Sequence, residues 1–171
     1  SQDSKAIFLQ SSINLPSQSS VISFGIRNEK TNFSAEDIVD RNVDGFKNSW
    51  NATDNDSLSS SSSNTVFNIG FEKILNEKFK VFTKYAESFR TPNIDERIKS
   101  TTSGSFALLD QETDEIELGL RYNDAKLNIT GSIYSMDSKN EIQYDQSKNT
   151  NLDPINREGL NFDFDYEINN K

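Results

Sequence analysis

The stretch Leu160-Asn161-Phe162-Asp163-Phe164-Asp165-Tyr166-Glu167-Ile168-Asn169 alternates strictly between apolar and polar residues. Successive side chains of a β-strand point to opposite faces, so a period of two predicts a strand with one apolar and one polar face. Such a strand must place its apolar face against something dry, either a protein core or lipid. The acidic residues of the other face must meet water or counter-charges.

The same period of two recurs along the chain. It is clear in residues 115–122, where Ile116, Leu118, Leu120 and Tyr122 share one face. It is less regular in residues 79–85, because Phe82 lies among the lysines of the polar face. The pattern predicts about seven strands, near residues 5–14, 20–32, 64–75, 79–89, 112–122, 126–144 and 156–168.

The connections between these strands alternate between short and long. Residues 16–20, 76–78 and 123–125 are tight turns, whereas residues 34–63, 90–111 and 145–156 are long and polar. A compact domain rarely spends so much chain on long loops, but transmembrane barrels have short turns on one side and long loops on the other. The sequence therefore predicts an all-β fold, an antiparallel up-and-down transmembrane β-barrel segment that forms an incomplete barrel.

Composition excludes several classes of function. The 171 residues carry a formal net charge of -9, which disfavours nucleic acid as a partner. There is no cysteine and no histidine, so thiolate metal sites and the commonest catalytic base are absent. We therefore expect no enzyme activity and no cofactor, and we assign no catalytic, cofactor-binding or metal-binding residue.

The polar faces of the predicted strands carry charges, namely Glu72, Lys80, Lys84, Glu115, Glu117, Arg121, Asp163, Asp165 and Glu167. A small barrel would have a packed apolar interior, so this pattern favours the water-filled interior of a wide barrel. The solvent-facing surface of a soluble sheet would give the same pattern. The charges would form cross-strand pairs on the interior wall or line a solute path.

Aromatic residues gather near the predicted strand ends, at Tyr85, Phe89, Tyr122, Tyr134 and Tyr144. They fit the aromatic girdles that mark the two interfaces of a membrane barrel. They fit equally well as residues that pack on cross-strand neighbours.

Several strings resemble one family. The segment Tyr85-Ala86-Glu87-Ser88-Phe89-Arg90-Thr91-Pro92-Asn93-Ile94-Asp95-Glu96 resembles the Phe-Arg-(Ala/Thr)-Pro-Asn turn of TonB-dependent receptor barrels. The segment 109–122 is similar to the family's Leu-x-Pro-Glu-x-x-x-x-Tyr-Glu-x-Gly string, with Gln111 in place of the usual proline and Ile116 in place of the aromatic residue. Segments 133–142 and 156–161 resemble the following strands, with Asn161 in place of an acid.

The resemblance implies a barrel of about twenty-two strands closed by an N-terminal plug, of which this chain would supply about a third. Nothing resembling the plug occurs in it, so we expect residues 1–171 to be a fragment of the barrel. The implied function is active uptake of a scarce nutrient such as a ferric siderophore, haem, cobalamin or a sugar. The implied partners are outer-membrane lipid, a small-molecule nutrient ligand and a TonB-type energy-coupling protein acting through the missing plug. The implied location is the cell outer membrane.

Three segments are candidates for further roles. Asp40, Asn42, Asp44 and Gly45 match the opening of a calcium loop, but Asn51 replaces the glutamate expected at the twelfth position, so an ordinary acidic loop is favoured. Residues 89–93 either fix the exit of a strand through Pro92, which is favoured, or contact ligand. Trp50 and the serine run 59–63 would lie in a solvated loop or help to capture a substrate.

Two other functions compete with an active receptor. The first is a passive outer-membrane porin-type barrel, against which the strings in residues 89–93 and 117–119 argue. The second is a soluble all-β binding module with an acidic face for adhesion. Fractionation of the full-length product and the presence of a plug domain would separate the three.

Overall fold

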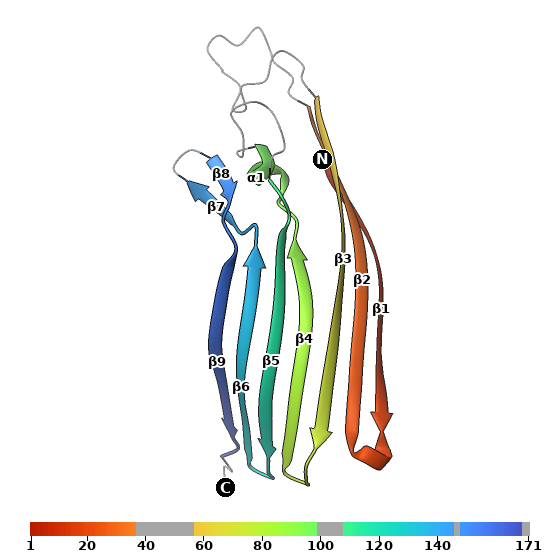
Figure 1. Ribbon diagram of the computed structural model, residues 1–171, viewed down its shortest axis with the longest axis vertical. Helices are drawn as coiled ribbons and strands as arrows, with labels where there is room; N and C mark the ends of the chain where they lie inside the picture. The colour runs from red at the N-terminus through yellow and green to blue at the C-terminus, as the bar shows by residue number, and fades with distance from the viewer. Residues whose placement is uncertain (37–56, 99–107, 146–147, 169–171) are drawn as a thin grey trace.

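The computed structural model describes residues 1–36, 57–98, 108–145 and 148–168. These residues form one curved antiparallel sheet, a short hairpin and two short helices (Figure 1). The elements are β1 (Gln2–Leu15), the 3-10 helix η1 (Pro16–Gln18), β2 (Ser20–Glu36), β3 (Ser57–Ile74), β4 (Phe79–Arg90), α1 (Ile94–Ile98), β5 (Gln111–Asn123), β6 (Leu127–Lys139), β7 (Ile142–Asp145), β8 (Lys148–Asn151) and β9 (Ile155–Tyr166). No helix within these ranges is long and apolar enough to cross a bilayer.

The main sheet has seven strands in the order β1-β2-β3-β4-β5-β6-β9, and every neighbouring pair is antiparallel. The short turns all lie at one end of the sheet, which we call the turn end, and the long connections lie at the other, the loop end (Figure 1). β7 and β8 form a separate two-stranded hairpin at the loop end, between β6 and β9. The predicted all-β, up-and-down antiparallel barrel segment is thus confirmed, and its sheet is open.

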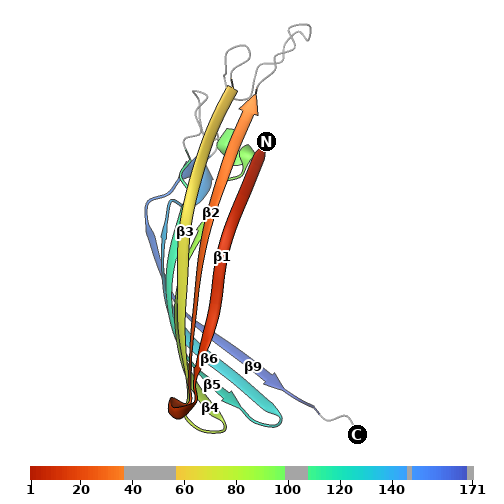
Figure 2. The ribbon, with the colours of Figure 1, turned by 90° about the vertical axis from the view of Figure 1, so that its right-hand side faces the viewer.

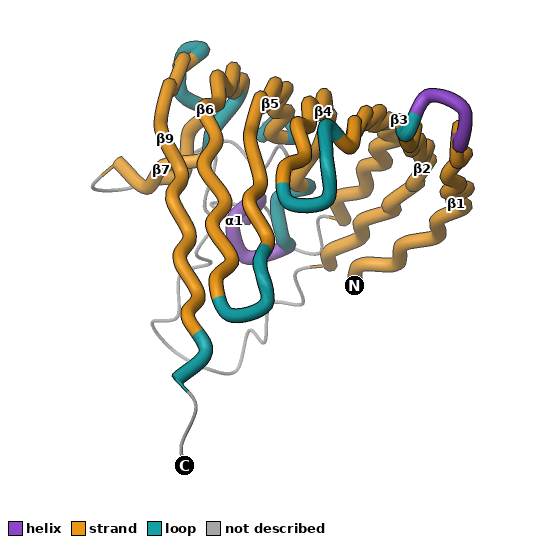
Figure 3. Tube along the Cα trace, turned by 90° about the horizontal axis from the view of Figure 1, so that it is seen from below, coloured by secondary structure: helices purple, strands orange, loops and turns teal. Residues whose placement is uncertain are grey.

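The sheet is bent across its width (Figures 2 and 3), and the alternation of its side chains gives it one apolar and one polar face. We call the face that carries the apolar alternation the outer face. Its side chains are strongly exposed, with exposed fractions of 67% for Phe162, 60% for Phe164, 56% for Ile116 and 51% for Leu118. Among the described residues only Phe33 and Leu108 are buried hydrophobic residues. The described residues therefore place no second protein layer over the apolar face, and a separate dry phase is needed to cover it.

The sequence analysis placed the serine run in a loop, but the structure places it in a strand. Residues 59–63 belong to β3, where Ser59 pairs with Ser34 and Ser63 pairs with Lys30 of β2. Strand pairing uses backbone donors and acceptors, so a polar run with no alternation can still extend a ladder begun by its neighbour. The interpretation of this run as solvated loop was wrong.

The predicted strand over residues 126–144 is divided in two. Asn140 has a φ of 57°, a left-handed conformation in which asparagine is among the most tolerated residues, and this separates β6 from β7. The amide Nδ2 of Asn140 donates to the backbone oxygen of Asp110 at 3.2 Å. The apolar positions change parity across the break, from Ile129 and Ile133 to Ile142 and Tyr144, and this change was the sequence signal for it.

Candidate functional site

The face opposite the apolar one, which we call the inner face, carries a band of cross-strand ion pairs. Lys80 Nζ lies 3.4 Å from Glu72 Oε1, and Arg121 pairs with the same carboxylate. Lys84 Nζ lies 3.2 Å from Glu115 Oε1. The three pairs join β3, β4 and β5, so the predicted pairing of inner-face charges occurs.

One inner-face carboxylate, that of Glu117, bonds to a hydroxyl and not to the cation opposite it. Glu117 lies opposite Lys84 in the register, but its Oε1 accepts a hydrogen bond from Ser132 Oγ at 2.6 Å. Ser132 lies on β6, so this bond extends the polar band by one more strand. Lys84 instead pairs diagonally with Glu115, as described above.

Phe82, the residue that broke the alternation, lies on the inner face and covers Gly119 of β5. A Cβ atom on Gly119 would come within 2.3 Å of Phe82 Cζ. The guanidinium of Arg121 lies 4.2 Å from the centre of the Phe82 ring, a favourable cation–π contact. Beside this ring is a hollow of 310 Å³ with charged walls, lined in part by Ser23, Gly70, Glu72 and Lys84.

The aromatic residues divide between the two faces. Tyr122 contacts Phe79 at a centroid distance of 5.0 Å, and Tyr85 contacts Phe67 at 5.4 Å; all four lie on the outer face. Tyr134 lies on the inner face, where a Cβ on Gly159 would come within 2.5 Å of its Cζ. Tyr134 therefore does not belong to an aromatic girdle on the outer face. The other interpretation, packing on a cross-strand neighbour, is the correct one for this residue. Tyr144 lies in β7, outside the main sheet.

The segment 89–93 ends a strand and begins a helix. β4 stops at Arg90, and Pro92 is buried. Asn93 Oδ1 accepts from the backbone nitrogen of Glu96 at 2.9 Å, and the Glu96 carboxylate accepts from the backbone nitrogen of Asn93 at 2.9 Å. This reciprocal capping box, closed further by the ion pair from Arg90 to Glu96, fixes the start of α1. The spacing Asn93-x-x-Glu96 was the sequence signal for α1, which the sequence analysis missed.

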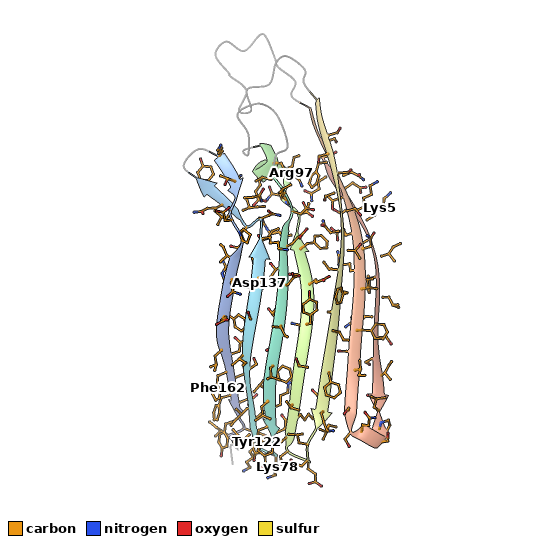
Figure 4. The ribbon with its side chains drawn as sticks, in the orientation of Figure 1. Lys5, Lys78, Arg97, Tyr122, Asp137 and Phe162 are labelled. Carbon is orange, nitrogen blue, oxygen red and sulfur yellow. The ribbon has the colours of Figure 1, made fainter. Side chains whose placement is uncertain are left out.

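Arg97 anchors α1 to the loop end of the sheet (Figure 4). Its side chain is 3% exposed; Nη1 donates to the backbone oxygen of Leu108 at 3.1 Å and Nη2 to Asp110 Oδ1 at 3.2 Å. Its guanidinium lies 4.1 Å from the centre of the Phe33 ring on β2. Burial lowers the pKa of Arg97, and the nearby carboxylate of Asp110 opposes that shift. The guanidinium therefore joins α1, the start of β5 and the inner face of β2.

The β7–β8 hairpin is tied to α1 and to the segment before β5. Asn149 is 9% exposed, and its Nδ2 donates to the backbone oxygen of Glu96 at 3.1 Å. The Asn151 side chain accepts from the backbone nitrogen of Leu109 at 2.8 Å and donates to the Leu109 oxygen at 3.2 Å. Glu141 forms two hydrogen bonds with Arg157, which lowers the pKa of that carboxyl. At the loop end, hydrogen bonds and ion pairs thus join α1, the segment before β5 and the β7–β8 hairpin.

Asp40, Asn42, Asp44, Gly45 and Trp50 lie outside the described residues. In the described ranges, no group of three or more acidic side chains is arranged to hold a metal ion. The described part of the chain therefore offers polar, aromatic and charged surfaces for binding.

An open antiparallel sheet with an exposed apolar outer face and an ion-paired inner face is a segment of a transmembrane β-barrel. Residues 1–170 match the family described as TonB dependent receptor-like, beta-barrel. The chain belongs to the TonB-dependent receptor barrel family.

Solved structures of similar fold agree with this membership. The chain is similar to the copper transporter OprC, with a TM-score of 0.75 and 17% identity over 98% of this chain and 27% of that one. It is similar to the ferric yersiniabactin uptake receptor FyuA from Yersinia pestis, with a TM-score of 0.72 and 16% identity over 98% of this chain and 24% of that one. It is also similar to the hemophore receptor HasR of Serratia marcescens, whose structure is a complex with HasA and heme, with a TM-score of 0.72 and 12% identity over 98% and 32%.

The chain spans about a quarter to a third of the length of these structures. The comparison with curated proteins gave no match. The family and these neighbours are receptors and transporters, which agrees with the expectation that the protein is not an enzyme.

Proposed function

We propose that residues 1–171 form one partial barrel domain of an outer-membrane receptor that takes up a scarce nutrient by active transport. The nutrient would be a bulky ligand such as a ferric siderophore, haem, cobalamin or a sugar. Energy would come from a TonB-type protein acting through a plug domain, and lipid would cover the outer face. The protein would have no enzymatic step of its own.

The observation that supports this proposal is that apolar side chains lie on the outer face and charged side chains on the inner face, the opposite of a water-soluble protein. Phe162, Phe164, Ile116 and Leu118 are exposed on the outer face, while the ion pairs of Glu72, Lys80 and Arg121 lie on the inner one. In water the exposed apolar face would be unfavourable, at about 25 cal/mol for each Å² left uncovered. In a bilayer the same apolar face would contact lipid acyl chains, and the inner face would line an aqueous space.

Membership of the family supports this function over its competitors. A passive porin would need no energy-coupling partner, whereas the matched family is described as TonB dependent receptor-like. A soluble binding module would need a second layer over the outer face, and the described residues provide none.

The test is uptake by cells that produce the full-length protein. Cells would be grown with one labelled nutrient at a time: a ferric catecholate, haem, cobalamin or maltotriose. We expect one of them to accumulate in cells with the gene, and accumulation to stop when the gene or the TonB-type protein is deleted. Accumulation that persists without the TonB-type protein would contradict active uptake and support the passive porin. Recovery of the full-length protein away from the outer membrane would support the soluble module.

A further inference from the structure

A pocket of 390 Å³ lies at the loop end between α1 and the β7–β8 hairpin. Its walls are Asn93, Asp95 and Glu96 from the helix side and Tyr144 and Asn149 from the hairpin side. Figure 1 shows the two elements next to each other above the ends of β5, β6 and β9. None of the ion pairs of the inner-face band reaches this pocket.

The two walls are held in place before any ligand arrives. The hydrogen bond from Asn149 Nδ2 to the Glu96 backbone oxygen joins them directly. The helix wall is itself fixed by the capping box of Asn93 and Glu96, and the next residue, Arg97, is buried. Binding of a ligand would therefore cost little conformational entropy in the protein. Such preorganisation is typical of binding sites.

The pocket offers acceptors rather than cations. The Glu96 carboxylate is neutralised by Arg90, whereas no described cation forms an ion pair with Asp95. Asn149 uses its Nδ2 toward Glu96, which leaves the acceptor Oδ1 for other partners. Together with the net charge of -9, a carboxylate that forms no ion pair with a described residue repels anionic ligands.

Tyr144 supplies the apolar part of the site. It is 59% exposed although it is a large aromatic residue, and it lies on the hairpin wall of the pocket. An aromatic ring beside carboxylate and amide oxygens matches a ligand with an apolar C–H face and a rim of hydroxyl donors. The hydroxyls would donate to Asp95 and Asn149, while the C–H face packs on the ring.

We propose that this pocket binds a neutral sugar unit, in which Tyr144 stacks on the ring of the sugar and Asp95 and Asn149 accept its hydroxyl protons. This proposal rests on the proposed receptor function and names the class of nutrient. It predicts that the receptor selects neutral oligosaccharides and discriminates against anionic ferric catecholates.

The experiment measures binding by titration calorimetry with the full-length receptor in detergent, using maltotriose, cellotriose and laminaritriose as probes. At least one of them should bind. Tyr144→Ala should weaken that binding about tenfold, the equivalent of losing one good ring contact. Tyr144→Phe should stay within about twofold, because it keeps the ring. Asp95→Asn should weaken binding several-fold, since a charged acceptor is replaced by a neutral one.

Gln143→Ala is the matched control, because Gln143 is exposed on the same strand and does not line the pocket. It should leave the affinity unchanged. The proposal is overturned if none of the three sugars binds, if Tyr144→Ala binds as well as the wild type, or if Gln143→Ala weakens binding as much as Tyr144→Ala. A receptor that takes up a ferric catecholate with TonB dependence but binds no sugar would keep the proposed function and refute this inference.

Discussion

At the scale of single residues, the close approach of Phe82 to Gly119 explains why an aromatic residue interrupts the polar face. A Cβ on Gly119 would meet Phe82 Cζ at 2.3 Å on one side and Ser132 Cβ at 2.9 Å on the other. Gly119→Ala should therefore push the Phe82 ring off Arg121 and destabilise the barrel by about 1–3 kcal/mol. Urea unfolding of the full-length protein in detergent would measure the loss.

Two further variants test the cause of that loss. Gly131→Ala should be nearly neutral, because its new Cβ would meet Phe162 at an ordinary 4.0 Å. Adding Phe82→Ala to Gly119→Ala should recover part of the stability by removing the clash. Equal effects of the alanines at positions 119 and 131 would refute the steric explanation.

A second residue-scale prediction concerns Asp124, in the turn between β5 and β6. Its carboxylate accepts from Lys78 Nζ at 2.8 Å, from the backbone nitrogen of Ala125 at 2.8 Å and from Tyr122 Oη at 3.1 Å. The hydrogen bond from Lys78 is the largest cause that lowers the pKa of Asp124 to about 2. Because the folded pKa is depressed, the stabilisation is present above the usual aspartate pKa of about 4 and is lost as pH falls toward 2.

Carbon NMR of labelled aspartate carboxyls in the full-length protein would follow this titration. The Asp124 signal should titrate near pH 2 in the wild type and at clearly higher pH in Lys78→Met. Lys126→Met removes the same kind of charge from the β5–β6 turn that holds Asp124 and should leave the midpoint in place, because Lys126 is not among the causes of the shift. If both variants moved the midpoint equally, general charge and not the Lys78 contact would be responsible.

At the scale of elements, β9 presents two faces that should respond differently to the same substitution. Phe162 is 67% exposed on the outer face, and its neighbour Asp163 points to the inner one. Lysine in place of Phe162 should cost about 2–4 kcal/mol in a bilayer, because the ammonium would enter hydrocarbon. Asp163→Lys should cost far less, since it faces water. Guanidinium unfolding in phospholipid vesicles would compare them, and equal costs would contradict the assignment of the faces.

The strands were predictable from sequence because a two-residue period is local, and the polarity of each residue indicates which face of the sheet it occupies. Ile116, Leu118 and Phe162 lie on the outer face as their parity indicates. The loop end was not predictable in the same way. Its decisive contacts join residues far apart in sequence, such as Asn149 to Glu96 across 53 positions and Asn151 to Leu109 across 42. Such hydrogen bonds leave no periodic trace, so Arg97 and the β7–β8 hairpin were missed.

At the scale of the whole molecule, the sheet has two open edges. Within the described ranges β1 pairs only with β2, and β9 pairs only with β6. Open edges do not occur in hydrocarbon, because each unpaired backbone group there costs several kcal/mol. Residues 1–171 produced alone should therefore associate edge to edge or aggregate in detergent, as exposed strand edges do in water. Size-exclusion chromatography with light scattering would show this, and hydrogen exchange would report on the amides of β1 and β9. A stable monomer with both edge strands protected would mean that seven strands close on themselves, and the assignment to part of a wider barrel would fall.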